Sequence, residues 1–122
     1  MAKPPQAKTP ESLLPLPSAA FHILVALADG DRHGYAILRD FGERTEGRLA
    51  LHPGTLYTAI RRLLEQELIV ELEDRPDPER DDGRRRYYSL TPFGRRVARA
   101  EVTRLEGLVT LARAAGLSPK RG

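Results

Sequence analysis

The feature that most constrains this chain of 122 residues is an amphipathic stretch from His52 to Leu64. Its large apolar residues recur at the intervals that place them on one face of a helix: Leu56, Ile60, Leu63 and Leu64. Pro53 suits the first turn of this helix, because the N–H group that proline lacks would have no partner there. At about 100° per residue, the opposite face carries polar side chains: Thr55, Thr58, Arg61, Arg62 and Glu65. The stretch therefore predicts a helix with one face in a core and one polar face.

Two interpretations of this polar face are open at this point. Hydroxyl and guanidinium groups together are suited to phosphate oxygens and to base edges in a major groove, which would make this a DNA-recognition helix with Tyr57 on its flank. The alternative is an ordinary amphipathic helix on a protein surface, which is the commoner case for one helix taken alone.

The basic residues of the chain are mostly arginines, and they are clustered. The chain has 20 Lys and Arg against 17 Asp and Glu, a net charge of +3, and a pI of about 9.6. The clusters are Arg61–Arg62, Arg84–Arg86, Arg95–Arg96 and Arg99. Local basic clusters favour a polyanion partner such as nucleic acid, and a solvated arginine-rich surface is the alternative.

Composition argues against several other classes of protein. The chain has no cysteine, which excludes a disulfide framework, a thiolate zinc site and a cysteine nucleophile. No apolar run approaches the ~18 residues that a membrane span needs, and the N-terminal residues lack the apolar region of a signal peptide, so we expect a cytoplasmic protein without membrane contact. His22, His33 and His52 share no ligand spacing, and no phosphate loop or nucleophile motif occurs. We therefore expect no enzyme, no metal site and no cofactor.

The N-terminal residues 1–17 hold five of the ten prolines of the chain, together with Lys3 and Lys8. Such a segment forms neither a helix nor a central strand, so we expect a flexible arm. Two interpretations of this segment are open: a basic arm that touches a DNA backbone, and a plain flexible tail. Its last leucines, Leu13, Leu14 and Leu16, are apolar enough to pack on the domain.

Two helices are expected between this arm and the amphipathic stretch. The first lies between Ser18, a good N-cap, and Gly30, a good stop after a helix C-terminus. The second opens at His33–Tyr35 and has an apolar side that extends to Phe41. Residues 49–51 are expected to form a short extended piece that leads into the third helix.

A β-hairpin is expected after the third helix. Leu68–Glu73 is short, partly alternating and β-branched, and Arg84–Leu90 alternates so that Tyr88 and Leu90 share the inner face. Between these strands, Asp74–Gly83 is polar and rich in turn residues, which predicts a long hairpin tip.

A long helix is expected at the end of the chain. Thr91–Pro92 is a cap followed by proline, and no proline occurs from there to about Ala115, a length of roughly 37 Å as a helix. Apolar residues form a stripe near heptad spacing: Val97, Val102, Leu105, Leu108, Val109 and Ala112. Since such a stripe beyond a compact unit is usually buried against another chain, we expect a homodimer. A helix folded back on its own core is the alternative.

The expected order is helix, helix, short strand, helix, strand, loop, strand and long helix. This is the order of a winged helix-turn-helix, a mainly α fold with a small β-hairpin. We expect residues 18–90 to form the winged-helix domain and residues 91–116 to form a C-terminal dimerisation helix. Residues 117–122 would be a basic tail.

An ordered set of motifs resembles the PadR-type transcriptional regulators. The motifs are His33–Ile37, Pro53–Tyr57 with Ile60 and Arg62–Leu63, Leu68–Ile69, and Gly83–Gly94. The resemblance runs from about Ser18 to the end of the chain, and the single C-terminal helix is similar to the short subfamily. It implies a prokaryotic, dimeric winged-helix repressor. Some short members bind flat aromatic drugs between tryptophans at the dimer centre, and this chain departs from them because it has no tryptophan.

The resemblance also implies which residues meet DNA. Thr55, Tyr57 and Thr58 match the part of the third helix that contacts DNA in this family, and Arg61 and Arg62 extend the same surface. Arg84, Arg85 and Arg86 match a basic wing.

The leading hypothesis is a sequence-specific regulator of transcription, a repressor that binds a near-palindromic operator in double-stranded DNA and is released by a small-molecule effector. Arg61 or Thr58 would read bases, and Thr55, Tyr57 and the wing arginines would set the register on phosphate. The alternative is a winged-helix protein-interaction module without specific DNA binding. The acidic residues of the hairpin loop favour this alternative because they would repel phosphate: Asp74, Asp77, Glu79, Asp81 and Asp82.

Overall fold

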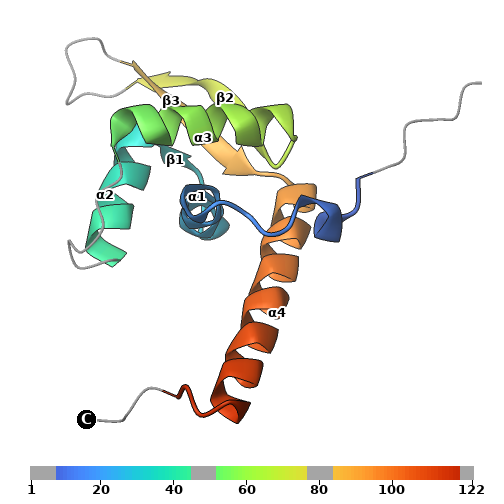
Figure 1. Cartoon of the computed structure of the whole chain (residues 1–122). Coiled ribbons are helices and arrows are strands. Elements are labelled where there is room, and N and C mark those ends of the chain that lie inside the picture. Colours follow the sequence, from blue (N-terminus) through green and yellow to red (C-terminus); the bar gives the residue numbers. More distant parts are fainter. Residues whose placement is uncertain (1–7, 45–51, 77–83, 119–122) are drawn as a thin grey trace, which may run out of the picture.

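The computed structural model describes residues 8–44, 52–76 and 84–118. Within these ranges the elements follow the order η1 (Pro10–Leu13), α1 (Ser18–Ala28), β1 (Arg32–His33), α2 (Gly34–Arg44), α3 (Pro53–Glu65), β2 (Ile69–Pro76), β3 (Arg84–Leu90) and α4 (Pro92–Ala114). Figure 1 shows α1, α2, α3 and the sheet gathered into one unit, from which α4 extends. This architecture confirms the predicted winged helix-turn-helix, mainly α with a small sheet.

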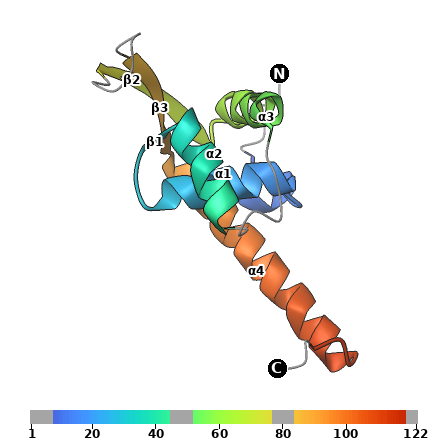
Figure 2. The ribbon, with the colours of Figure 1, turned by 90° about the vertical axis from the view of Figure 1, so that its left-hand side faces the viewer.

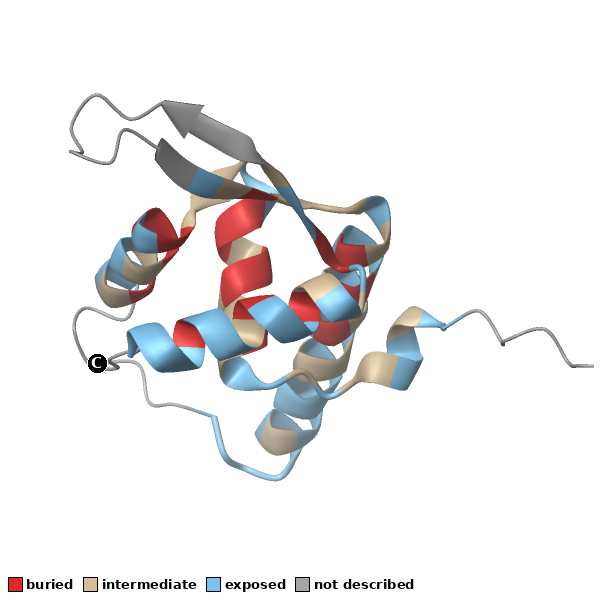
Figure 3. Ribbon diagram, turned by 90° about the horizontal axis from the view of Figure 1, so that it is seen from above, coloured by how far each residue is buried: buried red, intermediate tan, exposed pale blue. Residues whose placement is uncertain are grey.

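The core is centred on α1, which is covered on more than one side. Its buried residues are Ala20, Ile23, Leu24, Ala26 and Leu27. The residues that pack around them come from each neighbouring element: Ile37, Leu56, Ile60, Leu63, Leu68, Ile69, Tyr88 and Val97. Figure 3 shows the buried residues gathered on the helices around α1, whereas the far part of α4 is exposed. Burial of this apolar surface is the main source of stability for the fold.

The sheet has three antiparallel strands in the order β1-β3-β2. The hairpin of β2 and β3 was predicted, with Ile69 opposite Leu90 and Tyr88 buried on the inner face. The third strand differs from the prediction, because it is Arg32–His33, before α2, and it pairs with the outer edge of β3. Two residues are too few to show an alternating pattern. The extended piece expected at residues 49–51 lies outside the described residues.

The helix starts use different capping groups. The hydroxyl of Thr91 accepts a 2.9 Å hydrogen bond from the N–H of Gly94, as its position before Pro92 predicts. His33 caps α2, where its Nδ1 atom accepts from the N–H of Ala36 at 3.1 Å. The expectation that Ser18 caps α1 is wrong, because the helix already includes Ser18 and the capping residue, Pro17, offers no side-chain hydrogen bond.

The segment before α1 is not a flexible arm over its whole length. Residues 8–17 lie on the domain, where the short helix η1 packs against α4 and Leu13, Leu14 and Leu16 contact the core. The N–H of Leu16 donates a 2.8 Å hydrogen bond to Oε2 of Glu101 in α4. Apolar contact together with this hydrogen bond offsets the entropy lost on ordering the segment. The first seven residues of the expected arm lie outside the described residues.

Glu101 is a buried carboxylate with two partners. Its side chain is 2 % exposed. Oε1 accepts a 2.5 Å hydrogen bond from Nε of Arg104, one turn further along α4, while Oε2 accepts from Leu16. The hydrogen bond from Arg104 is the main cause that lowers the pKa of Glu101, and with the bond from Leu16 it outweighs burial. Glu101 therefore stays ionised and holds the N-terminal segment on α4.

Candidate nucleic-acid interface

Helix α3 has one buried face and one exposed polar face. Leu56, Ile60 and Leu63 are buried in the core. The residues predicted to contact DNA are all exposed on the rest of the helix: Thr55, Tyr57, Thr58, Arg61 and Arg62. Figures 1 and 2 both show α3 and the β2–β3 hairpin at one end of the molecule and the C-terminal part of α4 at the other. The polar helix face and the hairpin are thus available to one extended partner.

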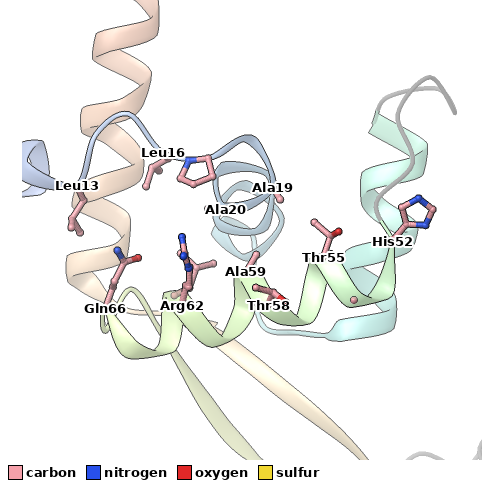
Figure 4. A pocket seen from close by; sticks show the side chains of 13 residues that line it. Leu13, Leu16, Ala19, Ala20, His52, Thr55, Thr58, Ala59, Arg62 and Gln66 are labelled. Atoms are coloured by element: carbon pink, nitrogen blue, oxygen red, sulfur yellow. The ribbon is translucent and has the colours of Figure 1, made fainter.

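The exposed residues of α3 point in different directions. At about 100° per residue, Thr58 lies opposite the buried face, and Arg61 follows it on the side of Tyr57. Arg62 lies on the other side, where Figure 4 shows its side chain directed from α3 toward the N-terminal segment and into a cavity. The single arginine surface predicted from the sequence is therefore two surfaces, because consecutive helical residues diverge around the axis.

Tyr57 connects α3 with the start of α2. A Cβ atom placed on Gly34 would lie 3.1 Å from the hydroxyl of Tyr57 and 3.3 Å from its ring. The absence of a side chain at Gly34 thus leaves room for this ring, half of whose surface stays exposed. Gly34 thus allows Tyr57 to lie on the flank of the polar face, a role that the sequence pattern of α2 did not indicate.

The hairpin carries one arginine whose surroundings are described. Arg86 is exposed, and its Nε lies 3.3 Å from Oε1 of Glu71 on the neighbouring strand. This pair partly neutralises the base of the hairpin. Arg84 and Arg85 continue β3 and pair with Pro76 and Arg75 of β2, but their side chains lie outside the described part of the chain. Of the acidic residues predicted to oppose phosphate, the side chain of Asp74 and the whole of Asp77, Glu79, Asp81 and Asp82 also lie outside it.

The stripe predicted as a dimer interface on α4 is buried at its first residue and exposed further on. Val97 is completely buried in the core of its own chain, so its side chain does not face outward. Val102, Leu108 and Val109 are 43 %, 50 % and 47 % exposed, and Leu105 and Ala112 are partly buried. Phe21 of α1 borders a shallow groove together with this stripe. The second half of α4 thus presents an apolar surface to solvent.

The described residues show no grouping of three or more His, Asp or Glu side chains that would bind a metal ion. His22 packs edge-on against Phe41, with ring centroids 4.6 Å apart. His33 packs edge-on against Tyr87 at 5.4 Å. In the same part of the chain, no helix combines the length and the apolar character that crossing a membrane requires.

The chain is similar to a protein family and to known proteins. A family model described as "Transcriptional regulator PadR-like family" matches residues 23–100 of the chain. A 37.1 kDa protein in transposon Tn4556 of Streptomyces fradiae is 40% identical over 90 residues, which are 71% of this chain and 24% of that protein. A protein from Lysinibacillus sphaericus, named only protein X, is 33% identical over 73 residues, or 60% of this chain and 64% of that protein. The chain thus spans less than two thirds of the length of either relative.

Two solved structures share the fold. A PadR family transcription regulator from Clostridium difficile R20291 matches with a TM-score of 0.66 and 23% identity, over 80% of this chain and 97% of that chain. Bacillus subtilis PadR in complex with operator DNA matches with a TM-score of 0.59 and 20% identity, over 72% of this chain and 48% of that chain. At these identities the two structures show a common fold and nothing more specific.

Proposed function

The chain belongs to the PadR-like family of transcriptional regulators, and on that basis we propose that it is a cytoplasmic repressor that binds double-stranded DNA as a homodimer. The observation that carries the proposal is the exposed polar face of α3 beside the hairpin, at the end of the molecule away from the apolar half of α4. The complex of Bacillus subtilis PadR with operator DNA supports it, since that protein shares the fold.

Thr58 and Arg61 are the residues that we propose for base contacts. Both are exposed, and they lie within about one turn of each other on the outward part of α3. A guanidinium group donates two hydrogen bonds to guanine O6 and N7 in a major groove, so Arg61 would specify a guanine. Thr55, Tyr57 and Arg62 lie on the flanks, where phosphate oxygens run beside the groove, and would set the register.

The hairpin is proposed to contact phosphate through Arg84, Arg85 and Arg86. Arg86 is the one whose side chain is described, and its ion pair with Glu71 is 3.3 Å long and largely exposed. An exposed pair of this kind contributes little to stability, so phosphate can compete for the guanidinium at little energetic expense.

The homodimer is proposed to form through the second half of α4. Val102, Leu105, Leu108, Val109 and Ala112 supply the apolar surface, and Phe21 extends it onto α1. A two-fold axis along α4 would present two copies of α3 to one duplex, and the half-sites would then lie one or more helical turns apart. Residues 18–90 would act as the DNA-binding unit and residues 91–116 as the dimerisation helix. A small-molecule effector would release DNA by binding better to the free form than to the DNA-bound form.

The test is a selection of operator sequences from a random duplex library, followed by affinity measurements in a salt series. The wild-type protein should recover a near-palindrome. Arg61→Gln should weaken binding to the selected site by about 1–3 kcal/mol, more than it weakens binding to random DNA. Arg99→Gln is the matched control, since Arg99 is an exposed arginine of α4 and lies on none of the proposed contact surfaces.

Failure to recover any preferred duplex would contradict the proposal. Affinity for DNA that does not change with salt would contradict the phosphate contacts. The first result would favour the winged-helix protein-interaction module instead.

A further inference from the structure

A cavity of about 710 Å³ lies between α3, the first turn of α1 and the N-terminal segment. Figure 4 shows the side chains that line it from these three elements. Its lining includes Leu13, Leu16, Ala19, Ala59, Arg62 and Gln66. The volume is within the roughly 300–1,000 Å³ of small-molecule sites in proteins.

The lining of the cavity is apolar on one side and mixed on the other. The N-terminal segment and α1 contribute apolar groups, including Leu13, Leu16 and Ala19. Helix α3 contributes the polar groups as well as apolar Ala59, and Figure 4 shows Arg62 and Gln66 directed from this helix toward the leucines. Among the side chains that the structure describes, no carboxylate pairs with Arg62. An apolar wall that faces a guanidinium with no carboxylate partner among the described side chains is complementary to an apolar molecule with one anionic group.

The apolar wall is part of the folded structure before any ligand arrives. The N–H of Leu16 is bound to the buried carboxylate of Glu101 at 2.8 Å, and Arg104 neutralises that carboxylate. Leu13 and Leu16 also pack against the core. Because the wall is held in place, a ligand would not have to order it, which lowers the entropic penalty of binding.

We propose that this cavity binds a small, mostly apolar organic anion, a carboxylate or a sulfonate, with its anionic group on Arg62 and its apolar body between Leu16 and Ala59. The proposal also gives the ligand a regulatory role, and this part rests on the proposed function. Thr55, Thr58 and Arg62 line the cavity and also belong to the face proposed to meet DNA. Ligand and DNA therefore exclude each other, since one guanidinium and one helix flank serve both.

The proposal predicts that anion binding and DNA binding weaken each other. A bound anion neutralises Arg62 and fills the space beside α3, so the affinity for DNA falls. By linkage, DNA lowers the affinity for the anion by the same factor. The chain thereby has a candidate effector site within one subunit, separate from the apolar surface of α4.

The binding test uses 8-anilinonaphthalene-1-sulfonate, a flat apolar anion, titrated by fluorescence into the full-length protein without DNA. The wild type should bind it saturably. Arg62→Gln should weaken binding about tenfold, the typical effect of losing a hydrogen bond to a charged group. Arg61→Gln is the matched control, since it removes the same charge one residue away and Arg61 does not line the cavity, so binding should be unchanged.

Two cavity-filling variants make the test independent of charge. Ala59→Leu fills the space from α3, and Ala19→Leu fills it from α1, so a folding defect in one leaves the other informative. Each folded variant should lose saturable binding. Retention of binding in a folded filling variant, or equal weakening by Arg61→Gln and Arg62→Gln, would overturn the proposal. A filling variant that changes the oligomeric state would also overturn it, because the cavity would then be a contact between subunits.

The regulatory part is tested by a competition experiment. At ten times its dissociation constant, the probe should lower the apparent affinity for the selected operator about tenfold in the wild type. In Ala59→Leu it should have no effect. Undiminished DNA affinity with the cavity occupied would overturn the exclusion. Absence of operator binding without any probe would instead be a failure of the proposed function, and the fluorescence titration would still report on the cavity.

Discussion

Gly94, in the first turn of α4, lies directly against the carbonyl group of Leu68 at the start of the hairpin. A Cβ atom on Gly94 would overlap the oxygen of Leu68 and would lie 2.9 Å from both the carbonyl carbon of Leu68 and Cδ1 of Leu90. The same carbonyl oxygen accepts a 3.1 Å hydrogen bond from the N–H of Thr91. The hydroxyl of Thr91 donates a further 3.0 Å hydrogen bond to this oxygen, so the start of α4 is joined to the start of the hairpin by direct backbone contact and by its capping side chain.

We expect Gly94→Ala to lower the free energy of unfolding by about 3 kcal/mol, because backbone atoms cannot move aside as a flexible side chain would. Gly107→Ala is the control on the same helix. No atom lies within 4 Å of a Cβ at Gly107, and alanine there should stabilise the chain by up to about 1 kcal/mol. Urea unfolding at a fixed protein concentration measures both. Equal effects of the two substitutions would show that the contact between Gly94 and the carbonyl group of Leu68 tolerates a side chain.

Gly34→Ala should weaken DNA binding with little effect on stability. The added methyl group displaces the ring of Tyr57, whose hydroxyl is the half-exposed end of a flexible side chain and can move. Loss of one well-placed contact corresponds to about fivefold in affinity. The control is Gly42→Ala in the same helix, where a Cβ meets no atom within 4 Å. Measured by fluorescence anisotropy on the selected operator, an unchanged affinity of Gly34→Ala would remove Tyr57 from the interface.

The carboxylate of Glu101 should stabilise the fold in a pH-dependent way. Its pKa is lowered in the folded chain, mainly by the hydrogen bond from Arg104, so the stabilisation is present above the unfolded pKa of about 4.3 and is lost as the pH falls through the folded pKa. At pH 7, Glu101→Gln should be less stable than the wild type by about 1 kcal/mol. The difference should shrink below a pH of about 4.

Unfolding curves of both proteins over the acidic range measure this difference, and Glu106→Gln, an exposed carboxylate on the same helix, is the control. A difference that stays constant down to the lowest pH at which both proteins fold would mean that the charge of Glu101 does not stabilise the fold.

The dimer should depend on one side of α4. Val109→Lys places a charge in the apolar stripe, where Val109 is 47 % exposed. Leu111→Lys places the same charge two residues away, about 160° around the helix, at a residue that is 68 % exposed. Sedimentation velocity should show a monomer for Val109→Lys and a dimer for Leu111→Lys, because burying an unpaired ammonium group is unfavourable. A dimer in both variants would place the interface elsewhere.

The long elements of the fold were predictable because their signals are local. Helix α3 repeats its apolar spacing over 13 residues, and Thr91–Pro92 marks the start of α4 within two adjacent residues. The strand Arg32–His33 was not predictable, since it exists only through its pairing with β3. The burial of Glu101 was not predictable either, because one of its partners, Leu16, is 85 residues away.

The sequence predicted which residue types form the candidate site better than it predicted the directions in which their side chains point. Every DNA-contact residue expected on α3 is exposed, but Arg61 and Arg62 serve different surfaces. The rotation of about 100° between them follows from the helix, but what Arg62 faces does not, because it is the N-terminal segment, whose prolines suggested an unstructured arm. Val97 was likewise placed in the wrong surroundings by the sequence. Heptad spacing does not distinguish a residue in the core of its own chain from one that faces a second chain.

The hydrogen bond between Leu16 and Glu101 also sets an order of events during synthesis. Leu16 leaves the ribosome before α4 has been made, and 85 residues separate donor from acceptor. At about 5–20 residues per second, translation of that interval takes roughly 4–17 seconds. The segment around Leu16 is therefore made well before α4 but reaches its place only after it, and a nascent chain that stops short of Glu101 lacks the carboxylate that holds this segment.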